Sequence, residues 1–426
     1  MRRLGAGFKP GTPGAASFYA IFTLGLHLIC ALVTAVPAVL APVAAPAFGM
    51  HPGGVGALIA VMFIVSLPAG LTTAGIVARV GAARACHLVA AGSAIALLLM
   101  AAAAYGALWA SSGGSVAPQA FVLLLLLSAA VLGFPIGMIN PLSSQILFRA
   151  APPRLRSFFF SVKQTAVPGA YVTAGLLVPA LLLVMSWQAA LLVMGVALCG
   201  WLLFTMTVHV EVASPAPDAR HPAGGLRAFV DPVVAVWRSP PLREMGLVSL
   251  LYSMNQTVMS AYLVSHLNLG VGLSLVAAGA IYAAGQFAGM AGRIVWGLSA
   301  DLWVKPRTQI GLLGVVGGLC ALIVATFSAQ WSQAAMLAVC VLFGFSAVSW
   351  NGIFLAEVAR LAALRDPGEI GAMTAGTGFF NNLGALCGPG LASVLVVTTN
   401  GYSTGFVVFA IPPLLLGAKL LLTRFR

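Results

Sequence analysis

Two basic residues of this sequence lie inside apolar stretches rather than in the polar segments between them. Lys163 lies some five residues inside the stretch 158–184, and Arg293 about six residues before the end of 273–299. In a helix of about 1.5 Å rise per residue, Lys163 is roughly 8 Å from the start of its stretch. A charge deep in a bilayer costs at least about 2.5–3.5 kcal/mol, so it normally faces a cavity or a partner. An arginine fork and a lysine ammonium lining one cavity would bind an anion.

A structural reading of both cations stays open. Long basic side chains can extend to the lipid head groups while their stems stay in the apolar layer. Arg293 can also pair with Glu357 or Asp301, which lie in or beside neighbouring stretches. Neither pairing is open to Lys163 within its own half of the chain, because no acid precedes residue 211.

Proton carriers are few in this sequence. Its acids number 8, and Glu357 is the candidate inside an apolar stretch, about one turn from its end. His27 lies near the middle of the first stretch, and a histidine titrates near neutral pH. A lone histidine on an apolar helix is also often a hydrogen-bonded packing residue, so both readings of His27 remain.

Uncharged polar residues at mid-depth of the apolar stretches are candidates for substrate contact, because such groups are uncommon where a helix faces lipid. The alternative is that they bond neighbouring helices or simply pack. The candidates are Gln164, Asn140, Asn255, Gln286 and Asn351, with Tyr252 and Tyr282 as wall residues.

The elements that carry these residues are membrane-spanning helices. The chain has 426 residues, of which 61% are hydrophobic and 7% charged, and its mean hydropathy is +1.04. Runs of about 20 apolar residues recur, and each can cross a hydrocarbon layer of roughly 30 Å. We predict an all-α membrane protein with spans at 17–43, 54–77, 84–106, 119–147, 158–184, 187–208, 245–266, 273–299, 308–328, 334–360, 371–397 and 402–421.

The basic residues set the orientation. Loops after odd-numbered spans hold no Lys or Arg, whereas loops after even-numbered spans hold many, as at Arg154 and Lys305. Cytoplasmic loops retain positive charge, so both termini are expected in the cytoplasm. The net charge of +13 is scattered over these loops, which favours anionic lipid head groups over nucleic acid as its partner.

The chain reads as two halves. Residues 1–208 and 244–426 each hold six spans, and the proline-rich stretch 209–243 reads as a cytoplasmic linker. Gly133-Phe134, Asn140 and Arg149 recur as Gly344-Phe345, Asn351 and Arg360, always 211 positions later. Four identities at one offset, in spans of equal rank, indicate internal duplication, and two such halves are typical of transporters.

The segment Gly75-Ile76-Val77-Ala78-Arg79-Val80-Gly81-Ala82-Ala83-Arg84 resembles the signature G-x-L-x-D-R-x-G-R-R of the major facilitator superfamily. A second copy follows span 8 as Gly297-Leu298-Ser299-Ala300-Asp301, with Lys305 and Arg307 after it. The segment Ser161-Val162-Lys163-Gln164-Thr165-Ala166-Val167-Pro168 is similar to a motif of a bacterial subgroup. The resemblance covers essentially the whole chain.

This resemblance implies alternating access, in which two halves rock about a central site and spans 5 and 8 face each other. It also implies a cytoplasmic gate, for which the matching residues are Arg79, Arg84, Asp301, Arg307 and Arg360. The first copy has Ala78 at the acidic position, which leaves Asp301 to form the gate with Arg360 and Glu357. The alternative is that Asp301 only offsets the loop bases.

Cofactor sites are not indicated. The 6 cysteines form no Cys-x-x-Cys pair, and no metal-ligand set or Ser-His-Asp set lies at the membrane surface. The glycines from Gly285 to Gly297 lack the Gly-Lys-Ser/Thr ending of a phosphate loop. We therefore expect neither an enzyme nor an ATP-driven pump.

The sequence favours a secondary carrier of a small organic anion, a carboxylate, in a bacterial inner membrane. We expect a monomer that imports its substrate by uniport, exchange or proton symport. One alternative is an efflux carrier for drugs or metabolites, although an exporter of cations would more often hold a buried acid in its first half. Another is a membrane scaffold or sensor that kept the fold and lost transport.

Overall fold

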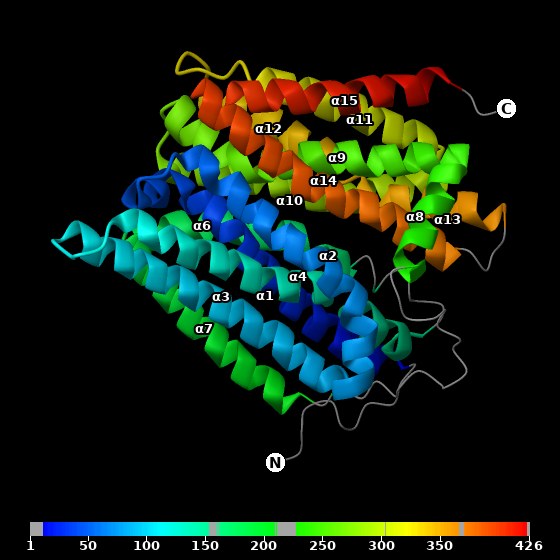
Figure 1. Cartoon of the computed structure of the whole chain (residues 1–426). Coiled ribbons are helices and arrows are strands. Elements are labelled where there is room, and N and C mark those ends of the chain that lie inside the picture. The colour runs from blue at the N-terminus through cyan, green and yellow to red at the C-terminus, as the bar shows by residue number, and fades with distance from the viewer. Residues whose placement is uncertain are drawn as a thin grey trace. The chain divides into compact units, whose positions relative to one another are not determined.

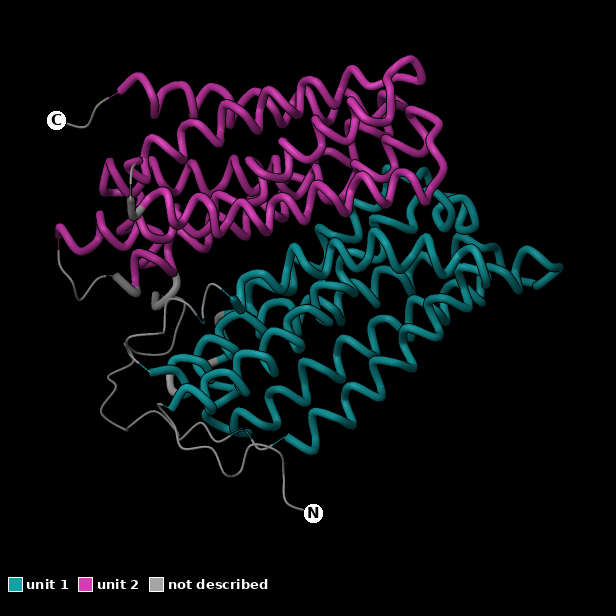
Figure 2. Tube along the Cα trace, turned by 180° about the vertical axis from the view of Figure 1, so that it is seen from behind, with its two compact units in different colours: residues 1–220 teal, residues 221–426 magenta. Residues whose placement is uncertain are grey.

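A computed structural model describes residues 12–152, 159, 162–208, 210, 227–302, 304–365 and 370–423, and only the backbone at 71, 74, 149, 227–229, 301, 302, 370 and 371. Helices make up this part of the chain, and no strand occurs among the described residues (Figure 1). The prediction of an all-α protein is confirmed. Contacts divide the chain into two compact units, residues 1–220 and 221–426 (Figure 2).

The described part of the first unit contains six long helices, with short 3₁₀ turns between some of them. The helices are α1 (Pro13–Ala44), α2 (Val55–Val80), α3 (Ala82–Ser111), α4 (Val122–Ala150), α6 (Ala166–Leu182) and α7 (Trp187–Thr207). Residues 162–164 are also helical, and a turn at Thr165 separates them from α6. The described part of span 5 therefore covers Val162–Leu182 and contains this turn.

The described part of the second unit contains eight helices. They are α8 (Arg227–Arg238), α9 (Pro240–Ser265), α10 (Leu275–Leu302), α11 (Pro306–Val324), α12 (Gln333–Ala347), α13 (Asn351–Ala363), α14 (Ile370–Thr399) and α15 (Ser403–Leu422). A π-helical turn, His266–Gly270, ends α9. Among the described residues, 11 segments are long and apolar enough to cross a membrane. The remaining predicted span, 245–266, corresponds to α9. This helix has 26 residues but contains more polar side chains than the others.

The two units repeat one packing pattern. In the first, α1 packs on α6, α2 on α4, and α3 on α7. In the second, α9 packs on α14, α10 on α12, and α11 on α15. These are spans 1 with 5, 2 with 4, and 3 with 6 of each half, so the internal duplication extends from sequence to packing.

Two glycines of the repeat allow the closest of these contacts. A Cβ atom on Gly133 would overlap the carbonyl oxygen of Met62, and a Cβ atom on Gly344 would overlap that of Gly285. Each glycine therefore brings the backbone of α4 or α12 against the backbone of its neighbour. The recurrence of these glycines at offset 211 has a packing cause.

The structure differs from the sequence prediction in the second part of the expected linker, 209–243. Residues 209 and 211–226 lie outside the described residues, but 227–238 form α8 and residues 240–243 begin α9. Pro240 and Pro241 occupy the first helical positions, where a missing N–H breaks no helical bond. The polar, proline-rich composition predicted a linker, and two of its prolines mark the start of α9.

Span 10 also differs from the single helix expected at 334–360. A turn at residues 348–350 separates α12 from α13. The hydroxyl of Ser346 donates to the carbonyl of Leu342 at 2.9 Å, and that of Ser349 to Phe345 at 2.5 Å. Such bonds from serine to the preceding turn compete with the backbone ladder and bend helices.

Candidate functional site

Lys163 is fully buried in the first unit and is held by α4. Its Nζ donates to Oδ1 of Asn140 at 2.8 Å and to Oγ of Ser144 at 2.9 Å, and it lies 3.4 Å from the Asn140 carbonyl oxygen. Asn140 and Ser144 are four residues apart and so share one face of α4. All of these acceptors are neutral, and no Asp or Glu occurs before residue 211. The side chain does not extend to the surface, so the reading of Lys163 as a residue that reaches head groups is disfavoured.

Arg293 lies on α10 and contacts the broken turn of span 10. Its Nε donates to the carbonyl of Val348 at 3.2 Å, and Nε1 of Trp296 donates to the carbonyl of Phe345 at 3.1 Å. The Phe345 carbonyl lies just before the break and the Val348 carbonyl at its first residue, where helical partners are lost. Arg293 thus stabilises the break. Glu357 pairs with Arg360 instead of Arg293, and the Asp301 side chain lies outside the described residues.

A cluster of polar side chains joins α9 to the start of α13. Oε1 of Gln256 accepts a bond from Nε1 of Trp350 at 3.0 Å and lies 3.4 Å from Nδ2 of Asn351. Trp350 is fully buried, and Tyr252 packs edge-on against it. Asn351 was expected as a substrate contact, whereas Gln256 and Trp350 were not. The signal for Gln256 was its place beside Asn255, but the sequence alone did not fix which face of α9 each occupies.

The other predicted contact residues of the second unit form bonds inside that unit. Gln286 donates to Oγ of Ser260 at 3.2 Å, and the hydroxyl of Tyr282 to the Ser260 carbonyl at 3.3 Å. The hydroxyl of Tyr252 donates to the Ile310 carbonyl at 2.9 Å. These three side chains are buried, which favours their packing role over a role in an open wall. Asn255 is buried as well, and Gln164 of the first unit is half-buried.

The candidate proton carriers lie in different settings. His27 is buried in α1. Glu357 is buried too and accepts two bonds from Arg360, one turn along α13, at 2.7 and 2.8 Å. His266, which the sequence analysis did not single out, is buried at the end of α9 with Nε2 2.9 Å from the carbonyl of Val324. Its ring lies 5.4 Å from that of Phe406, so it joins α9, α11 and α15.

The predicted gate residues are only partly brought together. Arg79 and Arg84 are exposed on either side of the α2–α3 turn. In the second unit, Arg307 forms an ion pair with Glu244, and Lys419 lies 3.2 Å from the same carboxylate. Glu244 therefore ties the starts of α9 and α11 to the end of α15. The sequence analysis did not single out this acid, because its partners come from distant parts of the sequence.

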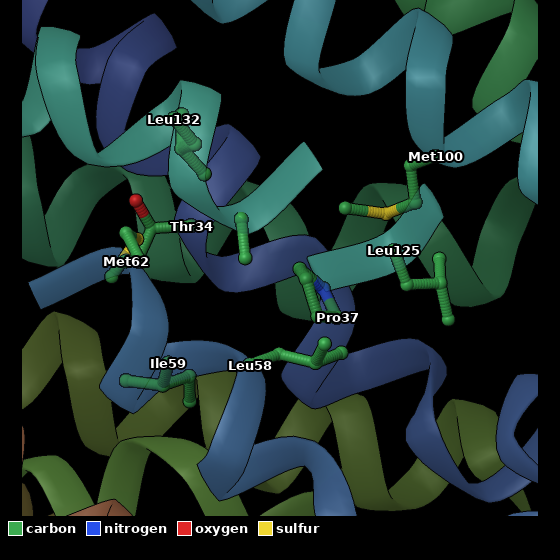
Figure 3. A pocket seen from close by; sticks show the side chains of 9 residues that line it. Thr34, Pro37, Leu58, Ile59, Met62, Met100, Leu125 and Leu132 are labelled. Carbon is green, nitrogen blue, oxygen red and sulfur yellow. The ribbon is translucent and has the colours of Figure 1, made fainter. Parts of the chain in front are cut away.

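An apolar pocket lies among α1, α2, α3 and α4 of the first unit (Figure 3). Thr34 is its one polar lining side chain, and Pro37, Leu58, Met62 and Met100 are among the others. None of the predicted site residues lines it. Among the described residues, no group of His, Cys, Asp and Glu could hold a metal ion.

Comparisons with known proteins agree with this architecture. The family model of the Major Facilitator Superfamily matches residues 23–366. A search of curated protein sequences gave no match. A mutant of the nucleoside transporter NupG is 14% identical with a TM-score of 0.71, over 95% of this chain and 98% of that one. The D-xylose-proton symporter is 15% identical with a TM-score of 0.64, over 94% and 97%.

The wild-type NupG structure gives a similar result, with 13% identity and a TM-score of 0.68 over 94% of this chain and 98% of that one. At these identities the likeness concerns the fold. The family match covers most of the chain, and the segments long enough to span a membrane recur in both units. The protein is a multi-pass membrane protein, and it belongs to the major facilitator superfamily.

Proposed function

We propose that this chain is a secondary carrier that imports a small organic anion, a carboxylate, across a bacterial cytoplasmic membrane, with both termini in the cytoplasm. The observation that carries the proposal is the buried ammonium of Lys163. Its acceptors on Asn140 and Ser144 are neutral, and the first 210 residues contain no carboxylate. A bound carboxylate would stabilise an ammonium that is buried in an apolar layer.

Arg293 supports the same reading from the second unit. It is the cation at similar depth in span 8, and its Nε donates to the carbonyl of Val348. A guanidinium suits a planar carboxylate. Uniport, exchange and proton symport are all compatible with this pair of cations, and His27 and Glu357 are the proposed proton carriers for symport.

A second candidate substrate is a neutral, hydroxyl-rich solute. The amide of Gln256, with Trp350 and Asn351, offers donors and acceptors without net charge. The similar structures are of a nucleoside transporter and a D-xylose-proton symporter. The buried Lys163 argues for the anion, because an ammonium forms a stronger hydrogen bond with a carboxylate than with a neutral hydroxyl.

Flux measurements on the purified, reconstituted protein separate these candidates. Liposomes are screened with labelled carboxylates, sugars, nucleosides and organic cations, with and without a pH gradient. We expect saturable carboxylate uptake. Uptake of sugars or nucleosides alone would favour the second candidate, outward movement of cations would favour an efflux carrier, and the absence of any flux would favour a scaffold or sensor.

A substitution of Lys163 then tests its role. Lys163→Ala and Lys163→Gln should lower carboxylate uptake by about 10- to 100-fold, the worth of a charge-assisted hydrogen bond. Lys305→Ala, which removes an exposed loop lysine, is the matched control and should transport normally. Wild-type rates in folded Lys163→Gln would remove Lys163 from the site.

A further inference from the structure

The short helix α8 presents three different faces. One face lies against α9 and α14, with Val236 fully buried and the ring of Trp237 stacked 5.9 Å from that of Phe380. A Cβ atom on Gly376 of α14 would come 2.5 Å from the carbonyl oxygen of Pro232, so the two helices touch closely. This face fixes α8 to the second unit.

The neighbouring face of α8 is apolar and exposed. Val230, Val234 and Trp237 are 45%, 36% and 48% exposed, respectively. They are spaced by four and three residues, so they form one continuous stripe on the helix. In an aqueous environment, these three apolar side chains would be in contact with water.

The remaining face carries charge. Asp231 and Arg238 are exposed there, and Arg243 is exposed one turn into α9. The nearest buried acid, Glu244, is already bound by Arg307 and Lys419. Arg238 and Arg243 therefore have no carboxylate partner within the described ion pairs.

The position of α8 along the chain determines what adjoins these faces. It ends at Arg238, and α9, which corresponds to the predicted span 245–266, begins at Pro240. With α9 crossing the bilayer, the exposed stripe would lie where the apolar layer meets the head groups. Helices with one apolar and one charged face lie in that interface, and tryptophan is enriched there.

We propose that α8 lies in the cytoplasmic interface of the bilayer, where its stripe of Val230, Val234 and Trp237 contacts acyl chains and Arg238 and Arg243 bind the phosphate of an anionic phospholipid. The complementarity is chemical on both counts, since an apolar stripe meets lipid tails and two guanidinium groups outside the described ion pairs meet a phosphate. The inference rests on the proposed cytoplasmic topology and not on which solute is carried.

Fluorescence quenching at Trp237 tests the position of the helix. The full-length protein and Trp237→Phe are reconstituted in phosphatidylcholine vesicles whose acyl chains are brominated either near the head group or near the methyl end. The difference between the two proteins isolates Trp237 from the other tryptophans. We expect this difference signal to be quenched more by the shallow bromines than by the deep ones. A difference signal that neither lipid quenches would overturn the proposal.

The charge requirement is tested at the same tryptophan. Brominated phosphatidylglycerol, as a minority component in unbrominated phosphatidylcholine, should quench Trp237 about threefold more than brominated phosphatidylcholine at the same fraction. Arg238→Gln/Arg243→Gln should remove this preference and leave the shallow quenching intact. The matched control, Arg79→Gln/Arg84→Gln, removes two exposed arginines of the first unit and should keep the preference. Equal quenching by both lipids in the wild-type protein would contradict anionic-lipid binding.

Discussion

Lys163 depends on two side chains of α4 for the hydrogen bonds of its ammonium group. Ser144→Ala removes the acceptor at 2.9 Å and should lower the free energy of unfolding by about 1.5–3 kcal/mol, because the lost bond involves a charged group. Denaturation in mixed micelles measures the change. Ser143→Ala is the matched control, because that hydroxyl donates to the Ile139 carbonyl of its own helix, and its loss should cost much less. Equal effects of the two substitutions would show that Ser144 does not support Lys163.

The sequence predicted the position of a single side chain better than the identity of its hydrogen-bond partners. Lys163 was predicted inside an apolar stretch, and the structure buries it. Its partners were harder to predict, because the bond from the lysine to Asn140, a predicted substrate contact, joins two separate helical segments. Gln256 and Glu244 were missed because their partners lie about 60 to 175 positions away, and periodicity contains no such information.

Helix pairs in the second unit meet through glycine. Gly344→Ala should destabilise the protein by at least about 1–3 kcal/mol, because its new methyl group would overlap the Gly285 carbonyl and force α12 away from α10. Gly297 lies in α10, and a Cβ atom added there would meet open space. Gly297→Ala should therefore stabilise the helix by up to about 1 kcal/mol. Thermal unfolding of both purified variants measures the contrast. A neutral Gly344→Ala would mean that the two helices do not pack as closely as described.

A second link between elements is the carboxylate of Glu244. Glu244→Gln should cost on the order of 3 kcal/mol, because the largely buried Arg307 loses its counter-charge and α9, α11 and α15 lose their common contact. Lys419→Met should cost at most about 1 kcal/mol, since the lysine is 59% exposed and its pairing is screened by solvent. Melting temperatures in detergent would rank the two, and the reverse order would contradict the role of Glu244.

Helix boundaries were predicted well where the length of an apolar run determines them. They were predicted poorly where local hydrogen bonds or helix-capping residues determine them. Most spans begin and end within a few residues of their expected positions, because a run of about 20 apolar residues has one outcome in a bilayer. The helix α8 was expected as linker, because its prolines read as breakers and its amphipathic faces were not considered. The break of span 10 was not visible either, because the serine bonds that favour it are ordinary inside many helices.

At the scale of the whole molecule, the duplication was readable because it rests on few, spaced identities. Gly133 recurs in the sequence as Gly344. Each of them brings the fourth span of its half against the second span of the same half. The units also diverge, since the first contains no acid before residue 211 and the second contains the Glu244 and Glu357 ion pairs. The two units thus share their helix packing but differ in their charged residues. This indicates that apolar contacts, rather than ion pairs, determine the fold that they share.

Charge distribution makes one prediction about the whole chain, namely its orientation. Loops with Lys and Arg should face the cytoplasm, and those without them the outside. Ser112 lies in the turn after α3, and Lys305 in the turn before α11. In intact cells, Ser112→Cys should react with a membrane-impermeant maleimide, whereas Lys305→Cys should react only after permeabilisation. The wild-type protein is the control for labelling of its 6 native cysteines, all buried or half-buried. Labelling of Lys305→Cys in intact cells would place the basic loops outside and reverse the proposed topology, and with it the cytoplasmic location of α8.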